Sequence, residues 1–301
     1  MNREREAVAR ASGLIVLSSL GFGSLSTLAV LIIRSGLPLL PAMVWRYLLA
    51  AIILLFVLRR KGLESVTRNH AVRLMLVGGA FQSVITYLSL RALDYLPVGP
   101  LAFLFYTYPA WVVVMAAILG REKLTPDRVI ALSLAMTGIV IMVGAPSSAS
   151  LNTFGVLLAL GTALLYALYL PVLHRVQEGM PAAVSSFYLI SGVFIAFLAM
   201  SLGTRTMQLP STIEMWQYVL MLSLFSTVMA FATLVAGLRV LGPVRTSIIA
   251  TIEPFFTLLL GALFLGERIT AGTFAGGALI AAAVILLQIT AKNQSAVKAV
   301  S

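Results

Sequence analysis

The chain is divided into ten apolar segments, each long enough to cross the hydrocarbon core of a bilayer as a helix. Such a helix requires about 20 predominantly apolar residues. Hydrophobic residues make up 60% of the 301 positions and charged residues only 10%, whereas soluble proteins carry about 25% charged residues. We therefore predict an all-α integral membrane protein of ten transmembrane helices, over residues 11–33, 39–58, 72–92, 97–119, 128–145, 153–173, 182–202, 216–238, 243–264 and 271–290.

Composition also argues against several functions. The net charge of +11 is assigned to membrane topology and not to nucleic-acid binding, because of where the basic residues lie. The chain has no Cys, so a disulfide framework, a thiolate nucleophile and a Cys-ligated metal are excluded. The two His residues, His70 and His174, lie in different segments. We expect no metal site, no catalytic site and no cofactor.

The loops predict the orientation, because cytoplasmic loops are enriched in Lys and Arg. With a cytoplasmic N-terminus, 16 of the 21 Lys and Arg residues fall on the inner side. Arg46 lies within a span, and four fall on the outer side, namely Arg34, Arg91, Arg205 and Arg268. Ten spans with both termini in the cytoplasm account for this asymmetry.

The two halves of the chain resemble each other. Leu96, Pro109 and the turn at 122–125 (Glu-Lys-Leu-Thr) match Leu241, Pro254 and the turn at 267–270 (Glu-Arg-Ile-Thr) at a constant offset of 145 residues. We expect one five-helix repeat over residues 1–145 and a second over residues 146–301. Five is an odd number, so the second repeat is expected to be inverted relative to the first, as in secondary transporters.

The same residues carry a resemblance to a known family. The Glu253-Pro254 pair, the Gly266-Glu267 pair and an early Trp45-Arg46 in the second helix are similar to those of the drug/metabolite transporter superfamily. More narrowly, the chain resembles bacterial ten-helix exporters built from two EamA-type units. The first half departs from the pattern, because Tyr108-Pro109 stands where Glu-Pro occurs in the family.

The resemblance implies several expectations. Helices 1–4 and 6–9 would surround a central cavity, and helices 5 and 10 would be peripheral. The protein would lie in the bacterial cytoplasmic (inner) membrane. Its substrates would be amino acids or similar metabolites, with the aromatic amino acids among them.

Three prolines fall inside predicted spans. Pro109 and Pro254 are near the middle of the fourth and ninth helices, and Pro171 is late in the sixth. Each removes a backbone hydrogen bond, which neighbouring helices can compensate in a membrane protein. We interpret Pro109 and Pro254 as paired bends at the transport site, with simple packing geometry as the alternative.

Two charges interrupt the apolar segments. Arg46 lies in the second helix and Glu253 near the centre of the ninth. A charge at such depth costs about 2.5–3.5 kcal/mol on insertion scales, so each is expected to face protein or water. Arg46 is a candidate for binding a substrate carboxylate or for a structural pair. Glu253 is a candidate for binding a substrate ammonium or a coupling proton, or for donating a hydrogen bond within the protein.

Polar and aromatic residues at helical spacing complete the predicted substrate site. They are Gln82, Thr86 and Tyr87 on the third helix, Tyr106 and Trp111 on the fourth, and Tyr166 and Tyr169 on the sixth. The small polar face of the eighth helix is interpreted instead as a packing seam; it consists of Ser223, Ser226, Thr227 and Ala230.

We therefore predict a secondary transporter that exports small metabolites by alternating access through a central midplane site. Its partners would be a small-molecule substrate and membrane lipids. An intramembrane enzyme is disfavoured, because the spans contain no nucleophile with a base and no zinc-binding helix motif. A lipid flippase or a structural membrane protein without transport is the remaining alternative.

Overall fold

The computed structural model describes residues 2–62, 66–92, 94–96, 101, 104–118, 125–143, 152–266 and 271–297. Within these residues the regular structure is entirely helical, and helix is found in each of the ten predicted segments. The first half contains α1 (Asn2–Arg34), α2 (Leu39–Lys61), α3 (Arg68–Leu76), η1 (Val77–Gln82), α4 (Ser83–Ala92), α6 (Tyr108–Ile118) and α7 (Pro126–Val143). The second half contains α8 (Thr153–Val176), α9 (Ala182–Gly203), α10 (Ile213–Ser223), η2 (Leu224–Met229), α11 (Ala230–Ala250), α12 (Glu253–Leu265) and α13 (Ala271–Val297).

Six helical stretches among the described residues are long and apolar enough to cross a membrane: 6–34, 39–60, 68–89, 153–176, 182–203 and 213–250. The shorter apolar helices include α6 and α12. The prediction of a helical membrane protein is therefore confirmed. Asn152, at the end of the loop predicted between the fifth and sixth helices, caps α8 by accepting hydrogen bonds from the amides of Phe154 and Gly155.

The predicted ninth helix, 243–264, is wrong as a single element. The stretch 213–250 bends at Gly242, whose φ of 73° and ψ of 172° are not helical, and Pro243 then begins the last turns of α11. The regular α-helix gives way to a turn at Thr251 and Ile252, which keep right-handed helical φ and ψ, and α12 begins at Glu253. Glu253 and Pro254 therefore follow directly on a turn within this span.

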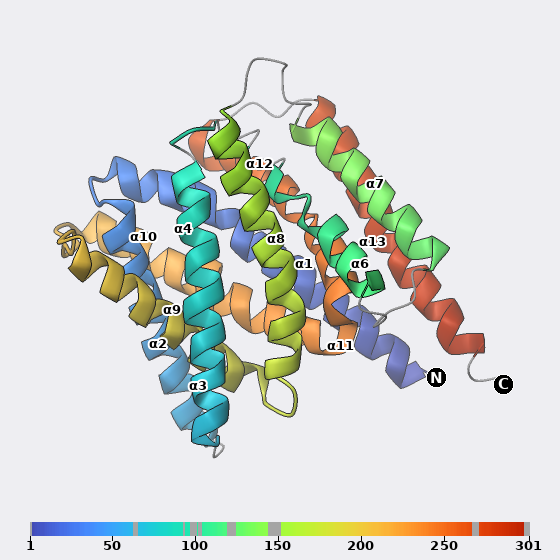
Figure 1. Ribbon diagram of the computed structural model, residues 1–301, viewed down its shortest axis with the longest axis horizontal. Coiled ribbons are helices and arrows are strands. Elements are labelled where there is room, and N and C mark those ends of the chain that lie inside the picture. Colours follow the sequence, from blue (N-terminus) through green and yellow to red (C-terminus); the bar gives the residue numbers. More distant parts are fainter. Residues whose placement is uncertain are drawn as a thin grey trace.

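The two halves pack against each other through corresponding helices. α2 packs on α9 and α7 packs on α13, while α1 packs on α11 and, correspondingly, α8 packs on α4. Figure 1 shows α7 and α13 side by side along one edge of the bundle, as expected for the fifth and tenth helices. The beginning of α1 and the end of α13 lie near each other at the same side of the molecule.

Among the described residues each half contains one π-helix, and the two lie within two residues of the positions that the 145-residue offset of the repeat would give. η1 spans Val77–Gln82 and η2 spans Leu224–Met229, an offset of 147 residues at both ends (224 − 77 and 229 − 82). A π-turn adds a residue to a helix and is rare, so its occurrence at such similar positions supports an internal repeat. The pattern of apolar residues did not indicate either one.

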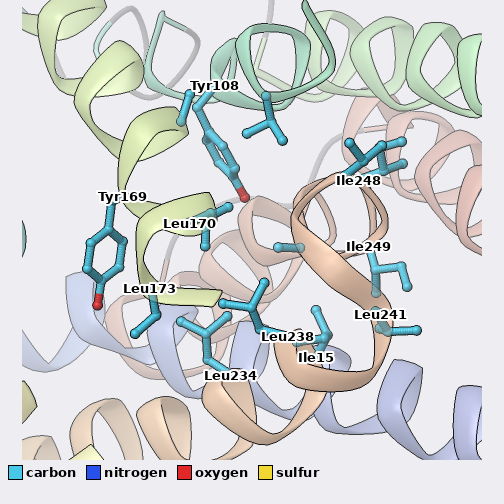
Figure 2. Packing of buried hydrophobic residues seen from close by; sticks show 14 of the residues in the cluster. Ile15, Tyr108, Tyr169, Leu170, Leu173, Leu234, Leu238, Leu241, Ile248 and Ile249 are labelled. Carbon is cyan, nitrogen blue, oxygen red and sulfur yellow. The ribbon is translucent and has the colours of Figure 1, made fainter. Parts of the chain in front are cut away.

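The largest apolar core joins the two halves around α8 and α11. Figure 2 shows Leu170 and Leu173 of α8 packing near Leu234 and Leu238 of α11, with Ile15 of α1 beside them. All five side chains are at most 3% exposed. Tyr108 projects from α6 toward this core (Figure 2), so the core adjoins the polar groups described below.

The π-helix η1 crosses α9 at very close range. A β-carbon added at Gly192 would overlap the backbone of Met75, and one at Gly78 would overlap the backbone of Leu189. Backbones approach this closely in membrane proteins only where small residues line the contact.

We expect Gly192→Ala to lower the free energy of unfolding by about 1–3 kcal/mol, because the added methyl group must push α9 away from Met75 at the end of α3, directly before η1. Gly161→Ala is the matched control, since a β-carbon at Gly161 in α8 meets nothing within 4 Å. The measurement is thermal and denaturant unfolding of both variants in detergent. Equal stability of the two variants would contradict the close crossing.

Candidate functional site

Two interrupted helices bring their first turns together. In the first half the chain makes a turn at Tyr106 and Thr107 before α6 begins at Tyr108; in the second it makes a turn before α12 begins at Glu253. Tyr108 and Glu253 are equivalent positions of the repeat, 145 residues apart (253 − 108). The N-terminus of a helix carries a partial positive charge, so the turn places Glu253 at the positive end of the α12 dipole.

Threonine hydroxyls add a second hydrogen-bond donor to backbone carbonyls at both turns, beside the amide of the same threonine. The Thr107 hydroxyl donates to the carbonyl of Leu104 at 2.6 Å, and the Thr251 hydroxyl donates to the carbonyl of Ile248 at 2.6 Å. In a bilayer an unpaired backbone group has no water to bind. The breaks are thus built into the local sequence, and each is stabilised by the residue at its turn.

Glu253 is bound by an aromatic hydroxyl from the other half. The Tyr106 hydroxyl donates a hydrogen bond to the Glu253 carboxylate. Tyr108 and Tyr166 also lie close enough to interact electrostatically with this carboxylate. Tyr106 is 6% exposed, whereas Glu253 and Tyr166 are only partly buried.

Aromatic rings form a continuous cluster beside Glu253. The ring centroids of Tyr108 and Tyr166 are 4.7 Å apart, those of Phe105 and Tyr166 are 5.6 Å apart, and those of Tyr166 and Tyr169 are 5.8 Å apart. These separations are typical of interacting aromatic pairs. The cluster connects α6 to α8, so residues of both halves form one surface of flat, polarisable groups.

Tyr169 ends the cluster with an unused polar atom. It is fully buried, and its hydroxyl has no hydrogen-bond partner among the described residues. Its ring centroid lies 6.3 Å from that of Phe81 in η1. A buried hydroxyl without a partner costs free energy, so this atom is suited to hydrogen-bond a polar group of a ligand.

Arg46 lies in a different environment, between α2 and η2. It is 1% exposed, and its Nε and Nη2 donate to the Thr227 hydroxyl at 2.6 Å and to the Ser226 carbonyl at 2.7 Å. Its Nη1 contacts the Met43 sulfur at 3.5 Å. Of the two roles expected for Arg46, these contacts favour the structural one.

The other predicted site residues are only partly brought together. Tyr87 and Trp111 are 44% and 39% exposed, so they lie on the outer surface and not with Tyr106. Gln82 and Thr86 bond within one helical turn, where the Thr86 hydroxyl donates to the Gln82 carbonyl at 2.8 Å.

The two prolines predicted to form bends lie directly after turns. Pro254 stands in the first turn of α12 and Pro109 is the second residue of α6. The missing N–H of a proline costs little in a first helical turn, because that group has no intrahelical partner. Pro171, by contrast, lies inside the continuous helix α8.

Sequence reasoning did not place Phe105 and Tyr108 among the site residues, although both lie in the cluster. The signal was present for Tyr108, because it aligns with Glu253 in the repeat. The repeated turns at 122–125 and 267–270 fall largely outside the described residues, which include only Thr125 of them.

The family and its relatives agree with this architecture. The model described as the EamA-like transporter family matches residues 10–144 and again residues 153–289. A riboflavin transporter of Brucella anthropi is 27% identical over 199 residues, which are 64% of this chain and 68% of that protein. An uncharacterized transporter of Archaeoglobus fulgidus is 25% identical over 227 residues, 74% of this chain and 78% of that protein.

A solved structure shares the fold. It superposes with a TM-score of 0.77 at 16% sequence identity, and the alignment covers 95% of this chain and 99% of that chain. At this identity the likeness concerns the arrangement of the helices alone.

We expect Tyr106→Phe to destabilise the protein by about 1–3 kcal/mol, because the Glu253 carboxyl group loses a hydrogen-bond partner inside the bundle. Tyr87→Phe removes the same atom from an exposed ring and serves as control. Unfolding of both variants in detergent gives the comparison. If Tyr106→Phe unfolds like the control, the bond to Glu253 contributes nothing to stability.

Proposed function

Since the chain belongs to the EamA-like transporter family, we propose that it exports small metabolites, most of all amino acids, by alternating access. It is a membrane transporter and not an enzyme. The observation that carries the proposal is the meeting of Glu253 with Tyr106, Tyr108 and Tyr166 at two helix breaks. Interrupted helices mark the substrate sites of many secondary transporters.

The chemistry of this cluster suits a solute with a cationic amine and an apolar or aromatic body. Glu253 offers a carboxylate to an ammonium group, and the rings of Tyr108 and Tyr166 offer flat surfaces for stacking and for cation–π contact. The free hydroxyl of Tyr169 offers a hydrogen bond to a further polar group. Aromatic amino acids combine these features.

A flavin is the second candidate substrate. The relative from Brucella anthropi carries the name riboflavin transporter, and an aromatic cluster also suits a planar, uncharged ring system. The two candidates differ in their need for Glu253, because a neutral flavin has no ammonium to place beside the carboxylate. A lipid flippase or a non-transporting subunit is a further alternative, which transport assays will test.

The proposed topology has ten spans, a cytoplasmic N-terminus and C-terminus, and two inverted repeats that divide at residues 145 and 146. The paired π-helices and the paired helix breaks support the repeat. The family and the charge distribution favour the bacterial cytoplasmic membrane. Rocking of one half against the other would expose the cluster to each side in turn.

We expect proteoliposomes that contain the protein to release preloaded aromatic amino acids faster than protein-free liposomes. Glu253→Gln should slow this release about tenfold or more, because an ion-paired hydrogen bond to the substrate is lost. Gln cannot ionise, so any dependence of the rate on pH should also disappear in this variant. Release at the rate of protein-free liposomes, across a broad panel of amino acids and riboflavin, would refute the transport proposal.

The identity of the substrate is tested by comparing two substitutions. Tyr166→Ala should slow both amino-acid and riboflavin transport, since stacking on the ring is common to both. Glu253→Gln should slow amino-acid transport only. Lipid scrambling by the same proteoliposomes, measured with a fluorescent phospholipid, is the outcome expected of a flippase.

A further inference from the structure

The two π-helices are held by different means. In the first half, η1 is fixed by contact between backbones, because Gly78, Gly79 and Gly192 leave no space between η1 and α9. In the second half, a guanidinium reaches across from α2 and binds η2 from the side. An internal repeat would give both halves the same arrangement, so the difference requires an explanation.

Arg46 binds the interior of the π-turn. The Ser226 carbonyl and the Thr227 hydroxyl, both in η2, accept its two hydrogen bonds. The Thr227 hydroxyl donates in turn to the Leu222 carbonyl, five residues back, at 3.0 Å. A π-turn pairs residues five apart, so Thr227 and Arg46 together stabilise the π spacing and not the α spacing.

The contact between Arg46 and η2 is extensive and buried, and it does not involve a salt bridge. The Ser223 hydroxyl donates to the Arg46 carbonyl at 2.9 Å, and the guanidinium lies 4.8 Å from the Tyr47 ring centroid. The salt bridges among the described residues do not include Arg46. A buried cation is expensive in a membrane protein, so its retention here indicates that it performs a task a neutral side chain cannot.

η2 is connected to Glu253 in two ways. α11 follows η2 directly and leads, through the bend at Gly242, to the break before Glu253. α1 touches both sites, because a β-carbon at Gly21 would lie 2.7 Å from the Phe225 carbonyl oxygen of η2, and one at Gly23 would lie 3.1 Å from the Glu253 carbonyl oxygen. A change of one residue in helical register rotates the following helix by about 100°.

We propose that Arg46 is a positioning residue, which holds η2 in the π register and thereby sets the orientation of α11 and of Glu253. Release of the two hydrogen bonds allows η2 to adopt the α register, and α11 then rotates. η1 cannot change register in this way, because the close packing of its glycines against α9 fixes it. The second half therefore contains the movable π-helix and the first half the fixed one.

The test uses spin labels, because the chain contains no Cys. Labels are attached at Arg175→Cys in α8 and Arg239→Cys in α11, both exposed positions, and their distance distribution is measured by pulsed EPR in nanodiscs without any substrate. We compare Arg46→Met, Arg46→Lys and Thr227→Val. Arg34→Met, which removes an exposed Arg at the end of α1, is the matched control.

The control should reproduce the single distribution of the parent protein. Arg46→Met should broaden it or add a second distance, Thr227→Val should do so to a smaller extent, and Arg46→Lys should partly restore the parent distribution because it keeps one donor. Should Arg46→Met fail to fold, Thr227→Val and Arg46→Lys still decide the outcome. Distributions unchanged in all three variants would overturn the proposal.

Transport kinetics separate positioning from direct binding. A positioning role predicts that Arg46→Met lowers kcat at least tenfold and changes KM less than threefold, with Arg46→Lys intermediate. A KM raised at least tenfold with an unchanged distance distribution would instead place Arg46 in contact with the substrate and overturn the proposal. The EPR measurement needs no substrate, so it stands or falls separately from the proposed transport function.

Discussion

The rest of this structure depends on one constraint. Where a helix is interrupted inside a bilayer, its backbone polar groups still need hydrogen-bond partners. Lipid offers no hydrogen bonds, so each interruption must be compensated by protein. At Thr107 and Thr251 a side-chain hydroxyl binds a backbone carbonyl at the turn, and in η2 the Ser226 carbonyl receives a guanidinium. These three irregularities are therefore each accompanied by a polar side chain that breaks the apolar pattern, whereas η1 is held by glycine packing.

This constraint explains which features the sequence predicts and which it does not. Apolar segments of about 20 residues predict helices because length and hydrophobicity are properties of single segments. The turns before Tyr108 and Glu253 depend on a balance between proline placement and the packing of neighbours, so Pro109 and Pro254 suggested bends but not the exact residues at which the regular helix gives way to a turn. The repeat aligns Tyr108 with Glu253, but the alignment alone does not show that the two side chains lie close together.

The π-helices and the roles of polar residues were harder to predict, because both depend on contacts between distant segments. Ser226 and Thr227 have the spacing of a packing seam, and nothing near them in sequence identifies Arg46, 180 residues away, as their partner. Tyr87 and Tyr106 are both tyrosines in apolar helices, yet one is exposed and the other is buried against Glu253. The side of a helix that faces lipid is decided by tertiary packing.

The two deep charges are stabilised by backbone dipoles and hydroxyl groups and not by each other. Glu253 lies at the N-terminus of α12 and accepts from Tyr106, while Arg46 donates to a carbonyl and a hydroxyl of η2. A salt bridge between them would neutralise both and leave the carboxylate unable to exchange partners, since breaking a buried pair is costly. Keeping the charges apart leaves Glu253 with a hydroxyl partner and, among the described residues, without a buried ion pair to break. A binding site that must release its ligand on the opposite side of the membrane requires that availability.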